Sequence, residues 1–173
     1  MSLRRADRPG DLGWVVMTHG ELYHEQFGWN TDFEALVARI VADYAGGHDA
    51  VREAGWIAEV DGRRVGCVFC IAGDEPGQAK LRILLVTPAA RGRGVGRLLV
   101  ARCLDFARSA GYRQVTLWTN DVLEQARRIY QSFGFTLVAE EPHRSFGVDL
   151  GGQHWTLALD DVESVRAYQE ALG

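Results

Sequence analysis

The stretch VTPAARGRGVGRLLV, residues 86–100, decides how this chain folds. It follows the apolar run AKLRILLV, residues 79–86, and leads into apolar residues spaced for one face of a helix over 95–110. Its three glycines let a ligand approach the backbone, and the first N–H groups of the helix lack partners within the helix. Because the helix dipole adds positive charge at that end, the stretch predicts an anion site suited to a pyrophosphate.

Three phosphate-binding patterns compete for this stretch. A P-loop requires a lysine after its last glycine, but the only lysine of the chain, Lys80, precedes the turn. A dinucleotide-binding fingerprint would place Arg97 where a small residue must let the helix meet the strand, and its usual acidic residue has no clear counterpart. The third pattern, Arg91-x-x-Gly94-x-Gly96, fits the sequence as it stands.

Length and composition limit the classes of protein. The 173 residues are 47% apolar, which predicts one domain, residues 1–173, with a sizeable core. The net charge of −4 argues against a general nucleic-acid partner. Since no apolar run reaches the roughly 18 residues of a membrane span and no signal peptide is evident, we expect a cytoplasmic protein without a membrane partner.

The three cysteines, Cys67, Cys70 and Cys103, predict no metal site. Cys67 and Cys70 have the C-x-x-C spacing, but they lie within an apolar, strand-like run. Side chains three residues apart on a strand point to opposite faces, and no second pair completes a zinc set. We therefore expect buried, reduced thiols.

Hydrophobic periodicity and turn residues predict a mixed α/β domain without repeats or linkers. Pairs with capping-box spacing, Thr31 with Glu34 and Asp121 with Glu124, are expected to begin two of the helices. The expected elements are a short strand at 3–6, helices from 11–26 and from 31 to the Gly46-Gly47 pair, two strands within 55–73 around the Asp61-Gly62 turn, a strand at 79–86, a helix at 95–110, a strand at 114–119, a helix ending before Gly134, strands at 135–141 and 153–159, and a helix at about 161–171.

The segments LLVTPAARGRGVGRLLV, residues 84–100, and YQSFGF, residues 130–135, resemble the GNAT superfamily of acetyl-CoA-dependent N-acetyltransferases. The resemblance covers about residues 55–159. Residues 13–29 and LWTNDVL, residues 117–123, also resemble the acetyltransferase domain found fused to MarR-type regulators. The resemblance implies the GNAT fold, a mostly antiparallel sheet of about six or seven strands that splays between strands 4 and 5 and is flanked by helices.

The resemblance also implies acetyl-CoA as co-substrate and assigns residues to it. The pyrophosphate would bind the loop formed by Arg91, Gly92, Arg93, Gly94, Val95 and Gly96, and the pantetheine arm would pair with Leu84, Leu85 and Val86. Asn120 would hydrogen-bond that arm or, alternatively, cap the next helix. Arg127 or Arg128 would reach the phosphates or belong to a solvated helix face.

The catalytic residues implied by the resemblance are Tyr130 as general acid for the leaving thiolate and a base that is harder to place. Many relatives carry a glutamate in the fourth strand, but LRIL, residues 81–84, contains no carboxylate. Glu59 is our first choice of base; a water chain is another candidate, as are Glu140, Glu141 and His143. His19 and Tyr23, four residues apart on the first helix, are expected to contact the acceptor.

These residues predict an enzyme that moves an acetyl group to a primary amine by direct attack on the thioester. The acceptor would be a small molecule or a protein amine, no metal would be needed, and a homodimer is expected from other members of the family. The alternative is a CoA-responsive binding or regulatory module with little catalysis, which the absent strand-4 glutamate favours.

Overall fold

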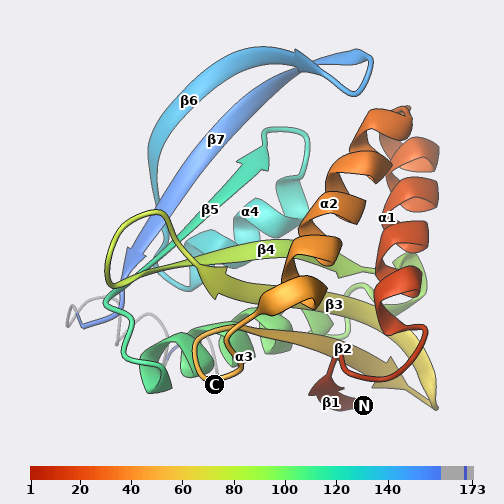
Figure 1. Ribbon diagram of the computed structural model, residues 1–173. Coiled ribbons are helices and arrows are strands. Elements are labelled where there is room, and N and C mark those ends of the chain that lie inside the picture. Colours follow the sequence, from red (N-terminus) through yellow and green to blue (C-terminus); the bar gives the residue numbers. More distant parts are fainter. Residues whose placement is uncertain (161–169, 171–173) are drawn as a thin grey trace.

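Seven strands form one sheet that is flanked by four α-helices in a computed structural model that describes residues 1–160 and residue 170 (Figure 1). The helix predicted at about 161–171 lies outside the described residues, apart from residue 170. None of the described helices is long and apolar enough to span a membrane. The elements are β1 Ser2–Arg5, α1 Asp11–Phe27, α2 Thr31–Gly47, β2 Ala54–Val60, β3 Arg63–Ala72, β4 Gln78–Val86, a 3-10 turn Pro88–Ala90, α3 Val95–Ser109, β5 Gln114–Asn120, α4 Glu124–Ser132, β6 Thr136–Ser145 and β7 Val148–Ala158.

The strand order β1-β2-β3-β4-β5-β7-β6 is antiparallel except between β4 and β5. That parallel pairing covers only Gln78–Lys80 of β4 and Gln114–Thr116 of β5. Beyond Lys80 and Thr116 the two strands run on without pairing to each other, so the sheet opens there. The predicted mixed α/β sheet with a splay between its fourth and fifth strands is confirmed.

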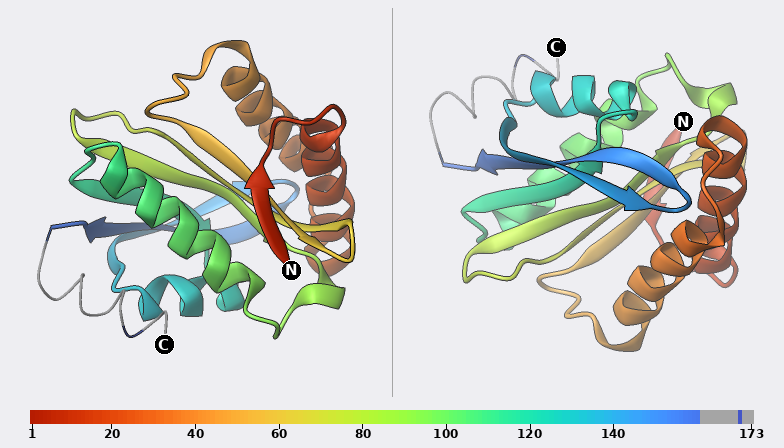
Figure 2. Two further views of the ribbon diagram at one scale, coloured as in Figure 1. Left: turned by 90° about the horizontal axis from the view of Figure 1, so that it is seen from below. Right: turned by 90° about the horizontal axis from the view of Figure 1, so that it is seen from above.

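Helices α1 and α2 cover one face of the sheet, and α3 and α4 cover the other (Figure 2). Alternating side chains of the strands fill the two cores: Trp56 packs on the α3 side, and its neighbour Ile57 packs on the α1 side. Cys67 likewise packs with α1 and α2, and Cys70 packs with α3. Both thiols are buried and free, as the strand periodicity predicted.

A bulge interrupts β4 beside the opening. Cys67 pairs with Leu85 and Phe69 pairs with Arg82, so Ile83 and Leu84 together face one residue of β3. Ile83 has φ +46°, an uncommon conformation for a β-branched residue. Its carbonyl accepts a hydrogen bond from the Cys67 thiol at 3.3 Å. Because of the bulge, Arg82 and Ile83 both lie on the α1–α2 side of the sheet.

Strands β6 and β7 are longer than predicted and form an arch that reaches α1 and α2 (Figure 1). The sequence predicts a loop across 142–152, but both strands continue to a turn at Phe146 and Gly147. Pro142 fits within β6 because β6 is the edge strand of the sheet. The Phe146 ring lies 5.0 Å from that of Trp29, and the Asn30 N–H donates to the Phe146 carbonyl at 3.0 Å.

The helices begin close to the predicted places, but the predicted capping boxes are wrong. Asn30 caps α2, because its side-chain oxygen accepts from a backbone N–H two residues further on, and Thr31 is already inside the helix. Leu123 precedes α4 and offers no capping side chain. Asp121 instead accepts the N–H of Gly151 at 3.0 Å and ties the end of β5 to β7.

Candidate active site

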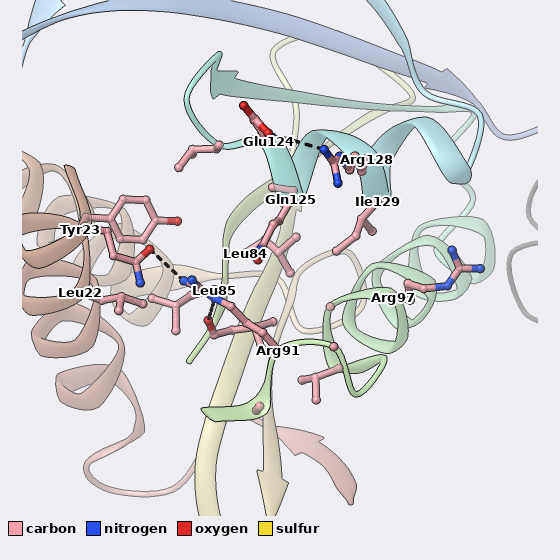
Figure 3. Close-up of a pocket in the computed structure, with 18 of the residues that line it drawn as sticks. Leu22, Tyr23, Leu84, Leu85, Arg91, Arg97, Glu124, Gln125, Arg128 and Ile129 are labelled. Carbon is pink, nitrogen blue, oxygen red and sulfur yellow. Dashed lines mark hydrogen bonds and ion pairs between the residues drawn. The ribbon is translucent and has the colours of Figure 1, made fainter. Parts of the chain in front are cut away.

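The glycine- and arginine-rich stretch borders a cavity of about 640 Å³, which we call the loop cavity (Figure 3). Its walls come from the end of α1, the end of β4, the loop 90–97 and the start of α4. All three strand residues predicted to pair with a pantetheine arm, Leu84, Leu85 and Val86, line it. The predicted loop residues Arg91, Gly92, Gly94, Val95 and Gly96 line it as well, but Arg93 does not.

The backbone of the loop leaves room for an anion. Gly92 has φ +72° and Gly94 has φ +76°, which glycine adopts at little cost, and no other group lies within 4 Å of a Cβ built at either. Gly94 is the N-cap of α3 and has no side chain to accept from the first amides of the helix. The residues that carry those amides, Val95, Gly96 and Arg97, line the loop cavity at the positive end of the helix dipole.

The arginines around the loop have different partners. Arg91 donates through Nε to the Val86 carbonyl at 3.3 Å and through Nη2 to the Gln26 side chain at 3.0 Å, so it joins the loop to β4 and α1 (Figure 3). Arg97 donates to the Ser132 hydroxyl at 3.2 Å.

The two candidate arginines of α4 differ in their position. Arg127 donates to the Asp121 carbonyl at 2.8 Å and does not line the loop cavity. Arg128 lines the cavity and forms an ion pair with Glu124 at 3.6 Å. Of the two arginines considered in the sequence, Arg128 is therefore the one at the cavity.

A second cavity of about 540 Å³ lies between α1, α2 and the sheet, and we call it the aromatic cavity. Trp29 and Phe33 line it on the helix side, and residues of β4, β5, β6 and β7 line it on the sheet side. Tyr23, Leu84 and Leu123 line both cavities. The two cavities therefore meet beside the β4 bulge, where the sheet is open.

Tyr130 of α4 is 4% exposed and lines the aromatic cavity. Burial raises the pKa of its hydroxyl well above the ordinary value, and the nearby Tyr23 raises it further. The phenol is therefore protonated throughout the physiological pH range and is available as a donor to a group in the opening.

A sequence model described as the acetyltransferase (GNAT) family matches residues 18–135, well over half of the chain. The chain belongs to the GNAT family of acetyltransferases. The GNAT fold implied by residues 84–100 and 130–135 is thereby confirmed.

Curated relatives of this GNAT chain are N-acetyltransferases. Human N-acetyltransferase 8B is 32% identical over 117 residues, which cover 64% of this chain and 52% of the relative. An N-acetyltransferase of Schizosaccharomyces pombe is 30% identical over 138 residues, covering 78% of this chain and 82% of the relative. Rat N-acetylaspartate synthetase is 34% identical over 88 residues, 51% of this chain and 29% of the relative. The chain thus spans about half of the human relative and less than a third of the rat one.

Solved structures show the same fold at lower identity. A Salmonella typhimurium protein described as an acetyltransferase, solved with its cofactor acetyl-CoA, has a TM-score of 0.72 and 22% identity, and the match covers 93% of this chain and 95% of that one. A GNAT acetyltransferase of Staphylococcus aureus has a TM-score of 0.76 and 14% identity, covering 92% and 99%.

His19 and Tyr23 of this GNAT chain both lie in the wall of the aromatic cavity. Their rings stack with centroids 5.7 Å apart. The His19 Nδ1–H donates to the Val15 carbonyl at 2.8 Å, so Nε2 carries the lone pair, and Nε2 is buried without a hydrogen-bond partner. Burial lowers the pKa of His19 to about 4, so its ring is neutral at pH 7.

Asn120 lies at the end of β5, is 2% exposed and lines the aromatic cavity. Its side-chain oxygen accepts from Nε2 of His143 at 2.8 Å, and Nδ1 of His143 lies 2.9 Å from the Ser145 hydroxyl. Asn120 therefore does not cap α4 with its side chain, which removes the structural alternative considered from the sequence.

None of the four carboxylate or imidazole candidates for the general base lines either cavity. Glu59 lies at the end of β2 and accepts from Arg4 at 2.8 Å. Glu140 accepts from Gln153, and the third glutamate, Glu141, is exposed on the edge strand β6. The fourth candidate, His143, bonds Asn120 as described above.

The wall of the aromatic cavity also contains four ionisable residues that were not predicted from the sequence: Asp74, Lys80, Arg82 and His154. Lys80 and Arg82 are two residues apart in an apolar strand, a spacing that places both side chains on one face. Two cations on one face of such a strand could have predicted their place in a cavity. Among the described residues, no three His, Cys, Asp or Glu side chains are grouped to hold a metal ion.

Proposed function

We propose that this GNAT chain transfers the acetyl group of acetyl-CoA to a primary amine. The observation that carries the proposal is the opening between β4 and β5, where pairing ends at Lys80 and Thr116 and the β4 backbone beyond Lys80 has no partner on β5. The Salmonella structure with acetyl-CoA has the same fold over nearly the whole chain, which supports this co-substrate.

The loop cavity suits the diphosphate and pantetheine parts of the co-substrate. The amides at the start of α3 and the backbone around Gly92 and Gly94 would bind the pyrophosphate, and Arg91 and Arg128 would add positive charge. The unpaired β4 edge would hydrogen-bond the extended arm as a further strand would, which orients the thioester toward the point where the cavities meet.

The acetyl group would then lie beside the β4 bulge, with the acceptor amine in the aromatic cavity. A backbone N–H of β4 near Leu84 would stabilise the oxyanion that forms when the amine attacks the carbonyl. Tyr130 would donate its phenolic proton to the departing thiolate. Since the candidate bases lie outside the cavities, water would take the proton from the amine and would return a proton to the Tyr130 phenolate.

The test is acetyl transfer itself. The full chain is incubated with acetyl-CoA and a panel of primary amines, thiol release is followed, and acetylated products are identified by mass spectrometry. Release that depends on an amine supports the proposal. Tight binding of acetyl-CoA without transfer to any amine contradicts it and favours a CoA-responsive regulatory module.

Four narrower expectations from the sequence stay predictions. The closer resemblance to acetyltransferase domains fused to MarR-type regulators is one, and the cytoplasmic location is the second. The third is the homodimer. The last is that the acceptor is a small molecule or a protein amine rather than a nucleic acid.

A further inference from the structure

An arginine of the aromatic cavity that has no ion-pair partner in the described part of the chain points to the chemistry of the acceptor. From this geometry we propose that the acceptor amine also carries a carboxylate, and that the Arg82 guanidinium binds it. The inference rests on the proposed function, because it concerns the second substrate of the same transfer.

Arg82 is held in the cavity wall by the strand around it. Its neighbour Leu81 packs in the α3-side core, so the alternation of β4 directs Arg82 to the α1–α2 side, where it lines the aromatic cavity. The bulge at Ile83 follows immediately. Arg82 therefore comes two residues before Leu84, which lines both cavities, on the strand that borders the proposed position of the thioester.

The guanidinium has no ion-pair partner among the described residues. Partial burial lowers its pKa from the ordinary value, and the carboxylates of Asp74 and Asp43 offset only part of this effect. Asp74 is already paired with Lys80 at 2.7 Å. Of the two cations that β4 contributes to the cavity, Lys80 is thus neutralised within the protein and Arg82 is left for a ligand.

Such a site discriminates between amines by charge. A protonated amine without an acid group would meet only repulsion from Arg82, whereas a carboxylate can accept two parallel N–H bonds from a guanidinium. These charge-assisted bonds would also replace the water that the half-buried guanidinium loses. We therefore expect amino acids to be preferred to simple amines of the same size.

The experiment uses matched sets of acceptors: an α-amino acid, its carboxamide and the corresponding decarboxylated amine, each for several side chains. The wild-type chain is expected to acetylate the acids with kcat/KM about tenfold or more above the amides, since a hydrogen bond to a charged group is worth at least that factor. The amide keeps the size of the acid and removes its charge, so the comparison isolates the charge.

Variants of Arg82 separate recognition from folding. Arg82→Gln is expected to raise KM for the acids about tenfold or more and to leave KM for the amides and the affinity for acetyl-CoA unchanged. Arg82→Lys should restore part of the preference because it keeps the charge without the planar fork. Arg102→Gln, at an exposed position on α3, removes one positive charge elsewhere and should leave the preference intact.

The outcomes distinguish this inference from the function on which it rests. If amides or plain amines are acetylated as well as the acids, or if Arg82→Gln lowers activity on acids and amides equally, the carboxylate inference is overturned and the acetyltransferase proposal stands. If no amine in the panel is acetylated although acetyl-CoA binds, the proposed function fails, and this inference fails with it.

Discussion

Nε of Arg4 donates to Oε1 of Glu59 across 2.8 Å, and the same guanidinium binds Asp11 through both of its terminal nitrogens. Asp11 in turn accepts from Arg64 at 2.8 Å. The four side chains join β1, β2 and β3 to the start of α1, and none of them lines either cavity. Glu59 is therefore part of an ion-pair network that holds the first strand and helix on the sheet.

This position of Glu59 predicts that Glu59→Gln leaves catalysis nearly unchanged. A general base contributes about 100-fold or more to the rate, so its removal would be easy to detect. We expect kcat and its pH profile to match those of the wild-type chain, measured by thiol release. A fall of about 100-fold, with loss of the acidic limb of the pH profile, would restore Glu59 as the base.

Asp11→Asn should destabilise the fold, and the stability of the variant should fall less than that of the wild type as the pH is lowered. The arginine partners lower the pKa of Asp11 to about 2, although burial alone would raise it. Asp11 therefore stabilises the folded chain above pH 4, and this contribution is lost as the pH falls from about 4 to about 2. Breaking a buried ion pair costs about 3–5 kcal/mol. Denaturant unfolding between pH 7 and pH 3 measures both effects; equal stability of variant and wild type at pH 7 would refute the prediction.

Most of the fold could be predicted from the sequence because the local patterns agree with the tertiary structure. Apolar periodicity placed the helices, and the turn residues Asp61 and Gly62 placed the hairpin. The prediction from the sequence was wrong at β6 and β7, where Pro142 and the glycines indicate a loop. Both strands continue through that region because they pair with each other. The predicted cap at Asp121 was also wrong, because the Asp121 side chain bonds a residue of β7 that is 30 positions away in the sequence.

The candidate site likewise has a part that could be predicted from the sequence and a part that could not. Part of the loop cavity is formed by a continuous stretch, residues 84–97, and that part could be predicted from the sequence, whereas α1 and α4 supply its other walls. The aromatic cavity brings together seven helices and strands, so the place of Arg82 in its wall could not be foreseen from the sequence. The contact of Glu59 with Arg4, 55 residues away, could not be foreseen either. Arg127 and Arg128 are adjacent on one helix, and the sequence did not indicate which of them lines the cavity. In the structure Arg128 lines it, and Arg127 bonds the Asp121 carbonyl instead.

Tyr130→Phe should lower kcat by about 100-fold and change the affinity for acetyl-CoA little, because only the proton donor is removed. Tyr112→Phe is the matched control: Tyr112 is also buried, but its hydroxyl donates to the Arg52 carbonyl and it lines neither cavity. The control should lose about 1 kcal/mol of stability and retain kcat. Equal kcat for Tyr130→Phe and the wild type would exclude Tyr130 as the acid.

His19 should make the fold less stable in mild acid. Its folded-state pKa of about 4 lies below the ordinary value of 6.5, so between these values the unfolded chain binds a proton that the folded chain does not. Stability is therefore lost as the pH falls from 6.5 toward 4. His19→Phe removes this effect, and its loss of stability between pH 7 and pH 5 should be smaller by about 2 kcal/mol. Parallel losses in urea unfolding would contradict the burial of a neutral His19.

Binding of acetyl-CoA, compared with S-acetylpantetheine, which lacks the pyrophosphate and the 3′-phosphoadenosine attached to it, tests the central claim most directly. The comparison is made by calorimetry on the wild-type chain, on Gly94→Val, and on Gly111→Val. Gly94 and Gly111 lie at opposite ends of α3, with φ +76° and +81° and open space around each, so the two substitutions impose similar backbone strain. We predict that the wild type and Gly111→Val bind acetyl-CoA far more tightly than S-acetylpantetheine, and that Gly94→Val loses this preference. A preference as large in Gly94→Val as in Gly111→Val would contradict the claim that the loop 91–96 binds the pyrophosphate.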